Sequence, residues 1–62
     1  MKRTFITKEK SKKTGKEFTA LIGISNNDKR YYLSFDRMTM LRLSNMTLAD
    51  FENIAVGDEI DV

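Results

Sequence analysis

The chain contains no cysteine, no histidine and no proline, and the first two absences narrow its chemistry most. Without cysteine, no disulfide supports a chain of 62 residues, a size that buries only about 60% of the surface exposed by its unfolded form. Without cysteine and histidine, a structural zinc site is excluded. The commonest general base and the commonest strong nucleophile are missing with them. We therefore expect one small domain over residues 1–62, which is not an enzyme and holds no metal or cofactor.

Long apolar runs are also missing. The longest have three residues, such as Ala20-Leu21-Ile22, far short of the roughly 20 residues that a membrane-spanning helix needs. The basic N-terminal residues are not followed by an apolar stretch, so they do not read as a secretory signal. Hydrophobic residues make up 40% of the chain and charged residues 32%, as in ordinary folded domains. These features predict a cytoplasmic protein that does not enter a membrane.

What the chain does contain is charge sorted by position. Residues 1–17 carry seven basic and two acidic side chains, a net charge of +5. Residues 43–62 carry five acidic side chains and no basic one, a net charge of −5. The overall net charge of +2 conceals this polarity. A one-sided basic segment creates a local positive potential, so the N-terminal part of the chain is suited to attract polyanions.

The N-terminal half is rich in β-formers and in alternating apolar and polar residues, and we expect strands at 3–8, 17–25 and 29–35. Residues 9–16 are polar throughout and contain Gly15, which suits a long charged hairpin loop. Asn26-Asn27-Asp28 marks a tight turn, because Asn and Asp tolerate left-handed backbone angles.

The hydrophobic pattern favours one register for the second hairpin. With Asn27 and Asp28 as its loop, all large apolar side chains share one face, and the pairs are Ile24 with Tyr31, Ile22 with Leu33, and Ala20 with Phe35. A loop one residue longer pairs Ile22 with Tyr32 and divides the apolar set between both faces, so burial selects the first register. A four-residue loop keeps the same pairs and stays open. We expect Tyr31, Phe18 and Phe35 in the core.

The segment 36–43 is compatible with two structures. It is either a short helix capped by Asp36 or a fourth strand, because short apolar runs are ambiguous by period alone. The pattern favours a strand, or a single turn followed by a strand. The helix alternative stays open.

The last third predicts a short helix and a strand. Thr47 and Asp50 have the spacing of a capping box, so Thr47 caps a helix over 48–53 whose Leu48 and Phe51 face the sheet. Residues 59–62 form the final strand, with Ile60 and Val62 pointing inward.

These elements predict a mainly β fold with one short helix. The order is β-β-β, then a segment that is β or α, then α-β. It suits a small bent antiparallel sheet or a barrel like the SH3 and OB folds, an analogy that carries no function by itself. The alternative is an α+β sheet with two short helices.

The basic segment holds most of the candidate binding residues. Lysine side chains neutralise phosphates and release condensed counterions, which gives salt-sensitive binding without sequence preference. The candidates are Lys8, Lys10, Lys12, Lys13 and Lys16, with Arg3 nearby. The alternative is a solvated hairpin whose charges only maintain solubility.

Tyr32 is the candidate aromatic contact. In the favoured register it lies on the outer face of the sheet near Arg30 and opposite Gly23, where a nucleic-acid base would stack on it. The alternative is that Tyr32 lies across Gly23 and fills the gap left by the missing side chain.

Other motifs are weaker. Gly15-Lys16 lacks the earlier glycine and the following hydroxyl of a phosphate loop. Asp58, Glu59 and Asp61 lack a cation-binding spacing and predict a solvated acidic rim.

Our leading hypothesis is a non-catalytic module that binds single-stranded DNA or RNA through the basic loop, Arg30 and Tyr32, as a phage or mobile-element replication accessory would. The second hypothesis is a small regulatory protein that binds a protein partner through its acidic face or a sheet edge. The third is a subunit that works only as a homo-oligomer.

Overall fold

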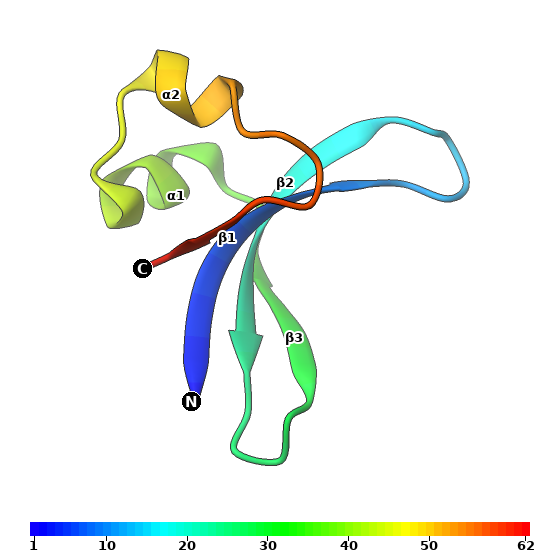
Figure 1. Ribbon diagram of the computed structural model, residues 1–62, viewed down its shortest axis with the longest axis vertical. Helices are drawn as coiled ribbons and strands as arrows, with labels where there is room; N and C mark the ends of the chain where they lie inside the picture. Colours follow the sequence, from blue (N-terminus) through cyan, green and yellow to red (C-terminus); the bar gives the residue numbers. More distant parts are fainter.

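The computed structural model describes residues 1–62, and its four strands form one open antiparallel sheet that is strongly bent (Figure 1). The elements are β1 (Arg3–Lys10), β2 (Glu17–Ile24), β3 (Arg30–Ser34), α1 (Arg37–Ser44), α2 (Leu48–Glu52) and β4 (Glu59–Asp61). The strand order in the sheet is β3-β2-β1-β4. The predicted mainly β fold and its element order are confirmed, and the sheet does not close into a barrel. Neither helix has the length or apolar character to cross a bilayer.

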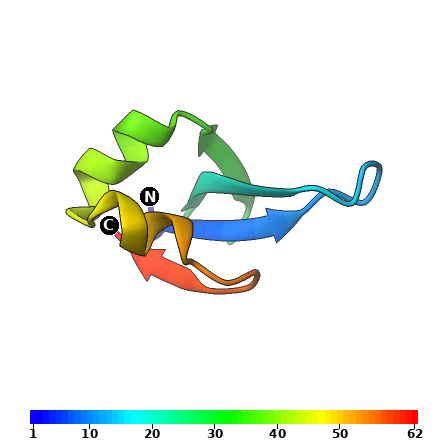
Figure 2. The ribbon, with the colours of Figure 1, turned by 90° about the horizontal axis from the view of Figure 1, so that it is seen from above.

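The β1–β2 hairpin is the longest element and extends beyond the rest of the sheet. Its strands pair over eight residues each, from Arg3 opposite Ile24 to Lys10 opposite Glu17. The strand is longer and the loop shorter than predicted, because Glu9 and Lys10 pair within the ladder and only residues 11–16 connect the strands. β4 pairs with β1 only from Phe5 to Thr7, so the outer end of the hairpin projects as an arm, away from both helices (Figure 2). We call residues 10–17 the arm.

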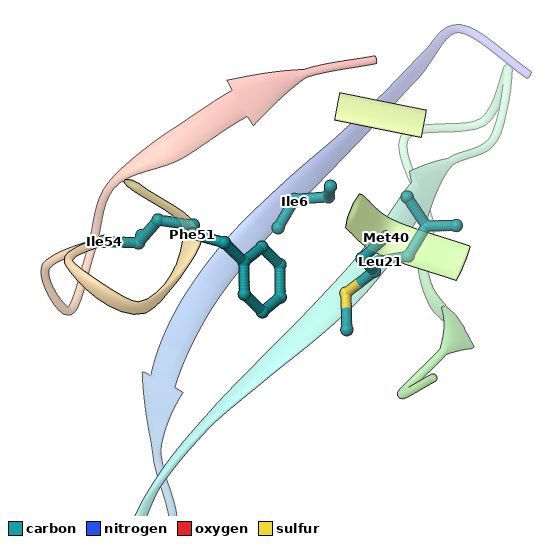
Figure 3. Packing of buried hydrophobic residues seen from close by; sticks show 5 residues of the cluster. All are labelled: Ile6, Leu21, Met40, Phe51 and Ile54. Carbon is teal, nitrogen blue, oxygen red and sulfur yellow. The ribbon is translucent and has the colours of Figure 1, made fainter. Parts of the chain in front are cut away.

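The central strands are buried on both faces of the sheet. On the helix-covered face, the helices and the segment after α2 close a core of Ile6, Leu21, Met40, Phe51 and Ile54 (Figure 3). On the opposite face, which we call the open face, a second buried cluster consists of Phe5, Ala20 and Ile22. Neighbouring residues of one strand therefore point into different cores.

The predicted register of the β2–β3 hairpin is wrong next to the turn. Its loop has three residues, with Asp28 at φ 61° and a hydrogen bond of 2.8 Å from the amide of Ser25 to the carbonyl of Lys29. Ile22 therefore pairs with Tyr32 rather than with Leu33. A β-bulge then leaves Leu33 without a partner on β2. Beyond the bulge Leu21 pairs with Ser34, which is the predicted register again. One-sided burial did not decide the register, because the sheet buries apolar side chains on both faces.

The register places the aromatic side chains differently from the prediction. Tyr31, not Tyr32, lies opposite Gly23, whereas Tyr32 lies on the open face with Ile22. Tyr31 and Phe35 are 47% and 61% exposed, so neither is a core residue. Phe18 is half-buried and packs against the cluster of the open face.

Residues 37–44 form helix α1, so the preference for a strand over this segment is wrong and the helix alternative is correct. The hydroxyl of Thr39 donates to Asp36 at 2.6 Å at the start of the helix. Asn45 ends it in the left-handed conformation, with φ 57°. The helical period brings Met40 into the core beside Leu21, and this tertiary contact decides between helix and strand.

Helix α2 begins as predicted. The Thr47 hydroxyl accepts a hydrogen bond of 3.1 Å from the amide of Asp50. Phe51 is buried, but Leu48 is 52% exposed, so only one of the two predicted contacts with the core forms. In β4, Ile60 packs on the core as predicted, whereas Val62 is exposed because it lies beyond the last paired residue.

We expect loss of the Thr47 cap to destabilise the whole domain, because α2 has only five residues and carries the buried Phe51. Thr47→Ala leaves the amide of Asp50 without its acceptor and should cost about 1 kcal/mol of unfolding free energy. For a domain of this size, that corresponds to a melting temperature lower by about 4–8 °C. Thr47→Ser keeps the hydroxyl and should melt near the wild-type temperature. Equal melting of both variants would show that the cap contributes nothing.

Candidate nucleic-acid interface

Four lysines of the arm have no ionic partner. Lys10, Lys12, Lys13 and Lys16 are exposed, and none of them takes part in any of the five salt bridges. The loop that carries them is closed by a hydrogen bond of 2.8 Å from the amide of Ser11 to the carbonyl of Lys16. Gly15 adopts φ 72° in this loop, a conformation that few other residues reach easily. The arm therefore presents a concentrated positive charge, in which none of the four lysines is held in a salt bridge.

Beside the base of the arm, the open face carries three aromatic side chains in contact. The rings of Tyr32 and Phe35 are stacked, with centroids 5.6 Å apart and an interplanar angle of 20°. The Phe18 ring is tilted by 56° against Phe35 at 6.1 Å. Tyr32 is 53% exposed and Phe35 is 61% exposed, so these rings face solvent. We call these three residues the aromatic cluster.

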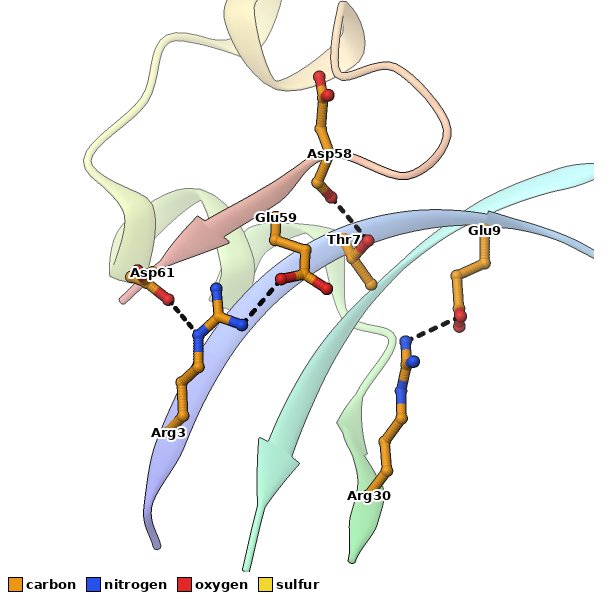
Figure 4. A network of polar contacts seen from close by, with 7 residues as sticks. All are labelled: Arg3, Thr7, Glu9, Arg30, Asp58, Glu59 and Asp61. Atoms are coloured by element: carbon orange, nitrogen blue, oxygen red, sulfur yellow. Dashed lines mark hydrogen bonds and ion pairs between the residues drawn. The ribbon is translucent and has the colours of Figure 1, made fainter. Parts of the chain in front are cut away.

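Glu9 connects the arm to the aromatic cluster. Its carboxylate accepts hydrogen bonds from the Tyr32 hydroxyl at 2.8 Å and from the Arg30 guanidinium at 2.9 Å (Figure 4 shows the latter). Phe18 is its cross-strand neighbour. The bond to Glu9 raises the pKa of Tyr32, because the phenol loses this bond when it ionises. Desolvation and the charge of Glu9 raise it further, whereas Arg30 lowers it.

A hollow of about 410 Å³ joins the two groups of residues. Lysines of the arm form one part of its wall and aromatic rings form another, and its lining residues are Glu9, Lys10, Ser11, Lys12, Lys13, Phe18 and Tyr32. Its size is within the range of pockets that hold small ligands, roughly 300–1,000 Å³. Positive charge, exposed aromatic surface and a hydrogen-bonding carboxylate therefore meet in one place.

Arg3 does not belong to this surface. Its guanidinium donates to Glu59 at 2.8 Å and to Asp61 at 2.7 Å (Figure 4). The same group lies 4.3 Å from the centre of the Phe5 ring. The bonds to Glu59 and then to Asp61 raise the pKa of Arg3. These carboxylates therefore neutralise Arg3 and form no salt bridge with the lysines of the arm. The acidic face required by our second hypothesis is partly neutralised by the same contacts.

Lys8 lies on the helix-covered face, where its ammonium donates to the carbonyl of Glu52 at 3.2 Å. Of the eight predicted binding residues, the structure thus brings six together on the arm and the adjoining open face: Lys10, Lys12, Lys13, Lys16, Arg30 and Tyr32. Arg3 and Lys8 are directed elsewhere by their partners.

Sequence reasoning missed Glu9, Phe18 and Phe35. The sequence pattern places Glu9 in the loop, but β1 extends to Lys10 and brings Glu9 opposite Phe18. The pattern places Phe18 and Phe35 in the core, where large aromatic residues usually lie. In the structure Phe18 packs at the edge of the open-face cluster, and Phe35 follows the short β3 and is largely exposed.

The acidic residues near the C-terminus diverge. Asp58 accepts a hydrogen bond of 3.1 Å from the amide of Ala55, while Glu59 and Asp61 hold Arg3. No group of three potential ligands suited to a metal ion is formed.

No protein-family model matches the chain, and comparisons with curated proteins and with solved structures gave no match either.

We expect Tyr32 to titrate above the ordinary tyrosine range, and replacement of Glu9 to reverse this shift. In a Tyr31→Phe protein, where Tyr32 is the only tyrosine, ultraviolet absorbance follows its ionisation alone. Adding Glu9→Gln should lower the pKa of Tyr32 towards its usual value, because the charged acceptor is gone.

The same bond makes a pH-dependent contribution to stability. Because the folded pKa is raised, the contribution is present below the unfolded value of about 10 and is lost as pH rises through the folded value. Identical ultraviolet titration curves for Tyr31→Phe and for Tyr31→Phe combined with Glu9→Gln would contradict the hydrogen bond between Tyr32 and Glu9.

Proposed function

We propose that the protein is a non-catalytic binder of single-stranded DNA or RNA, without strong dependence on overall sequence. The observation that carries the proposal is the hollow in which unpaired lysines of the arm meet Phe18 and the exposed ring of Tyr32. Unpaired lysines and exposed aromatic side chains are each common on protein surfaces. Their combination supplies both contacts that a flexible, unpaired strand requires.

The arm lysines would contact the phosphates. Lys10, Lys12, Lys13 and Lys16 form no salt bridge, so none of them has to release a bound carboxylate first. Binding would release counterions from the strand, and affinity would fall as salt increases. Because the arm projects from the body and away from both helices, a strand reaches it from solvent (Figure 2).

The aromatic cluster would contact the bases. Tyr32 and Phe35 expose their rings next to the arm, and each stacked base contributes about 1–3 kcal/mol. In a duplex the base faces are already stacked on their neighbours, so this contact favours single strands. Stacking accepts every base, which agrees with binding that does not depend on overall sequence.

We expect binding of a fluorescent oligonucleotide to weaken steeply with salt. Four lysine contacts predict a slope of about −3 in a plot of log affinity against log salt, at about −0.7 per phosphate neutralised on a single strand. Lys12→Glu should weaken binding several-fold and make the slope less steep. Anisotropy titrations at several salt concentrations measure both quantities.

Lys29→Glu is the matched control for this charge reversal. Lys29 is exposed at the β2–β3 turn, away from the arm, and it has no ionic partner (Figure 1). The change in net charge is the same, so a loss caused by net charge alone would appear in both variants. The proposal fails if the wild type does not bind at low salt, or if the two variants bind equally.

We expect Tyr32→Ala to weaken binding by about 1–3 kcal/mol, because one stacking surface is lost. Tyr31→Ala is the control, since Tyr31 is a neighbouring tyrosine of similar exposure on the opposite face. Thermal melting by circular dichroism establishes that both variants are folded. An equal effect of the two substitutions would place the base contact outside the aromatic cluster.

A further inference from the structure

Glu9 is unexpected in a surface that binds phosphates. Its carboxylate lines the hollow together with three lysines of the arm. A negative charge at this place repels a phosphate. A surface that contacted only phosphates would therefore bind nucleic acid more tightly without this carboxylate. The charge is balanced by Arg30 at 2.9 Å, which limits this repulsion. The carboxylate is therefore suited to contact a different part of a nucleotide.

The two oxygens of Glu9 have unused acceptor capacity. One accepts from Tyr32 and the other from Arg30, whereas a carboxylate offers about four lone-pair sites. The side chain of Glu9 is 26% exposed, so a ligand reaches it from the hollow. Its two existing bonds also fix its orientation, which lowers the entropy lost when it binds a ligand.

The position of Glu9 matches the edge of a stacked base. Its hydrogen bond to the Tyr32 hydroxyl places it at the polar end of that ring, and Phe18 lies across the strand pair from it. A base laid on the Tyr32 ring would therefore direct one edge towards the carboxylate. Lys12 and Lys13 lie on the same hollow and are available to the phosphate of that nucleotide.

An ionised carboxylate only accepts hydrogen bonds, so it discriminates between base edges. Guanine presents two adjacent donors on its Watson–Crick edge, at N1 and at the N2 amino group. Adenine and cytosine present one donor beside an acceptor, and thymine and uracil present one donor between two carbonyl groups. Only guanine forms two parallel hydrogen bonds with a carboxylate without facing an acceptor.

We propose that this hollow is a guanine subsite, in which Glu9 accepts hydrogen bonds from N1 and N2 of a single-stranded guanine nucleotide. The inference rests on the proposed function, because it names the base that the aromatic cluster and the arm hold best. The rest of the strand is bound without base preference, through lysine contacts and stacking.

The test compares three fluorescent oligonucleotides of about nine residues. One contains thymine only, one has a central guanine, and one has a central hypoxanthine, which keeps N1–H but lacks the N2 amino group. We expect the guanine strand to bind about fivefold or more tightly than the thymine strand, and the hypoxanthine strand to lose most of this gain. This comparison uses the wild-type protein and does not depend on the folding of a variant.

Two charge-matched variants then locate the preference. Glu9→Gln should bring the ratio of guanine to thymine affinity close to one. Glu17→Gln removes the same charge from an exposed arm residue that does not line the hollow, so it should leave this ratio as in the wild type.

The outcomes separate the two proposals. If no oligonucleotide binds, the proposed function itself fails. If the thymine and guanine strands bind equally well, single-strand binding stands and the guanine subsite is overturned. The subsite is also overturned if hypoxanthine equals guanine, or if Glu9→Gln keeps the wild-type preference.

Discussion

The β1–β2 hairpin is the element on which the rest of the structure depends, because it alone contributes to both buried clusters. Phe5 and Ile22 pair on the open face, and Ile6 and Leu21 pair on the helix-covered face. A chain of this size has little apolar surface to bury, so it uses both sides of one strand pair. The short adjacent apolar runs in these strands are typical of strands that are covered on both faces.

The two faces are covered by different means. Helices and their apolar side chains close one face, with Met40 and Phe51 at its centre. The other face has no helix, and the Phe5 ring is instead covered by guanidinium groups, with Arg3 at 4.3 Å and Arg30 at 5.8 Å from its centre. These arginines need acidic partners, which come from Glu9 and from β4. The charge pattern of the chain thus partly serves to cover a sheet face.

This use of charge also leaves the arm free. The C-terminal carboxylates closest to β1 pair with Arg3, so they are not available to the lysines of the loop. Pairing in the ladder continues to Lys10 and Glu17, well beyond the part of the sheet that β4 covers. The result is a projecting cationic hairpin next to the exposed rings of Tyr32 and Phe35. The proposed binding and the proposed guanine subsite both depend on this separation of charges.

The local features of this protein can be predicted from its sequence. The strands, the turn at Asn26-Asn27-Asp28, the cap at Thr47 and the lysine-rich loop all follow from neighbouring residues. Tertiary structure decided α1, because packing of Met40 against the sheet selects helix over strand. It also decided the β2–β3 register and the face of Tyr32, since burial on both faces removes the one-sided pattern on which register reasoning depends. Which charges are free and which are paired depends on residues more than fifty positions apart, such as Arg3 and Glu59, and no local pattern contains that information.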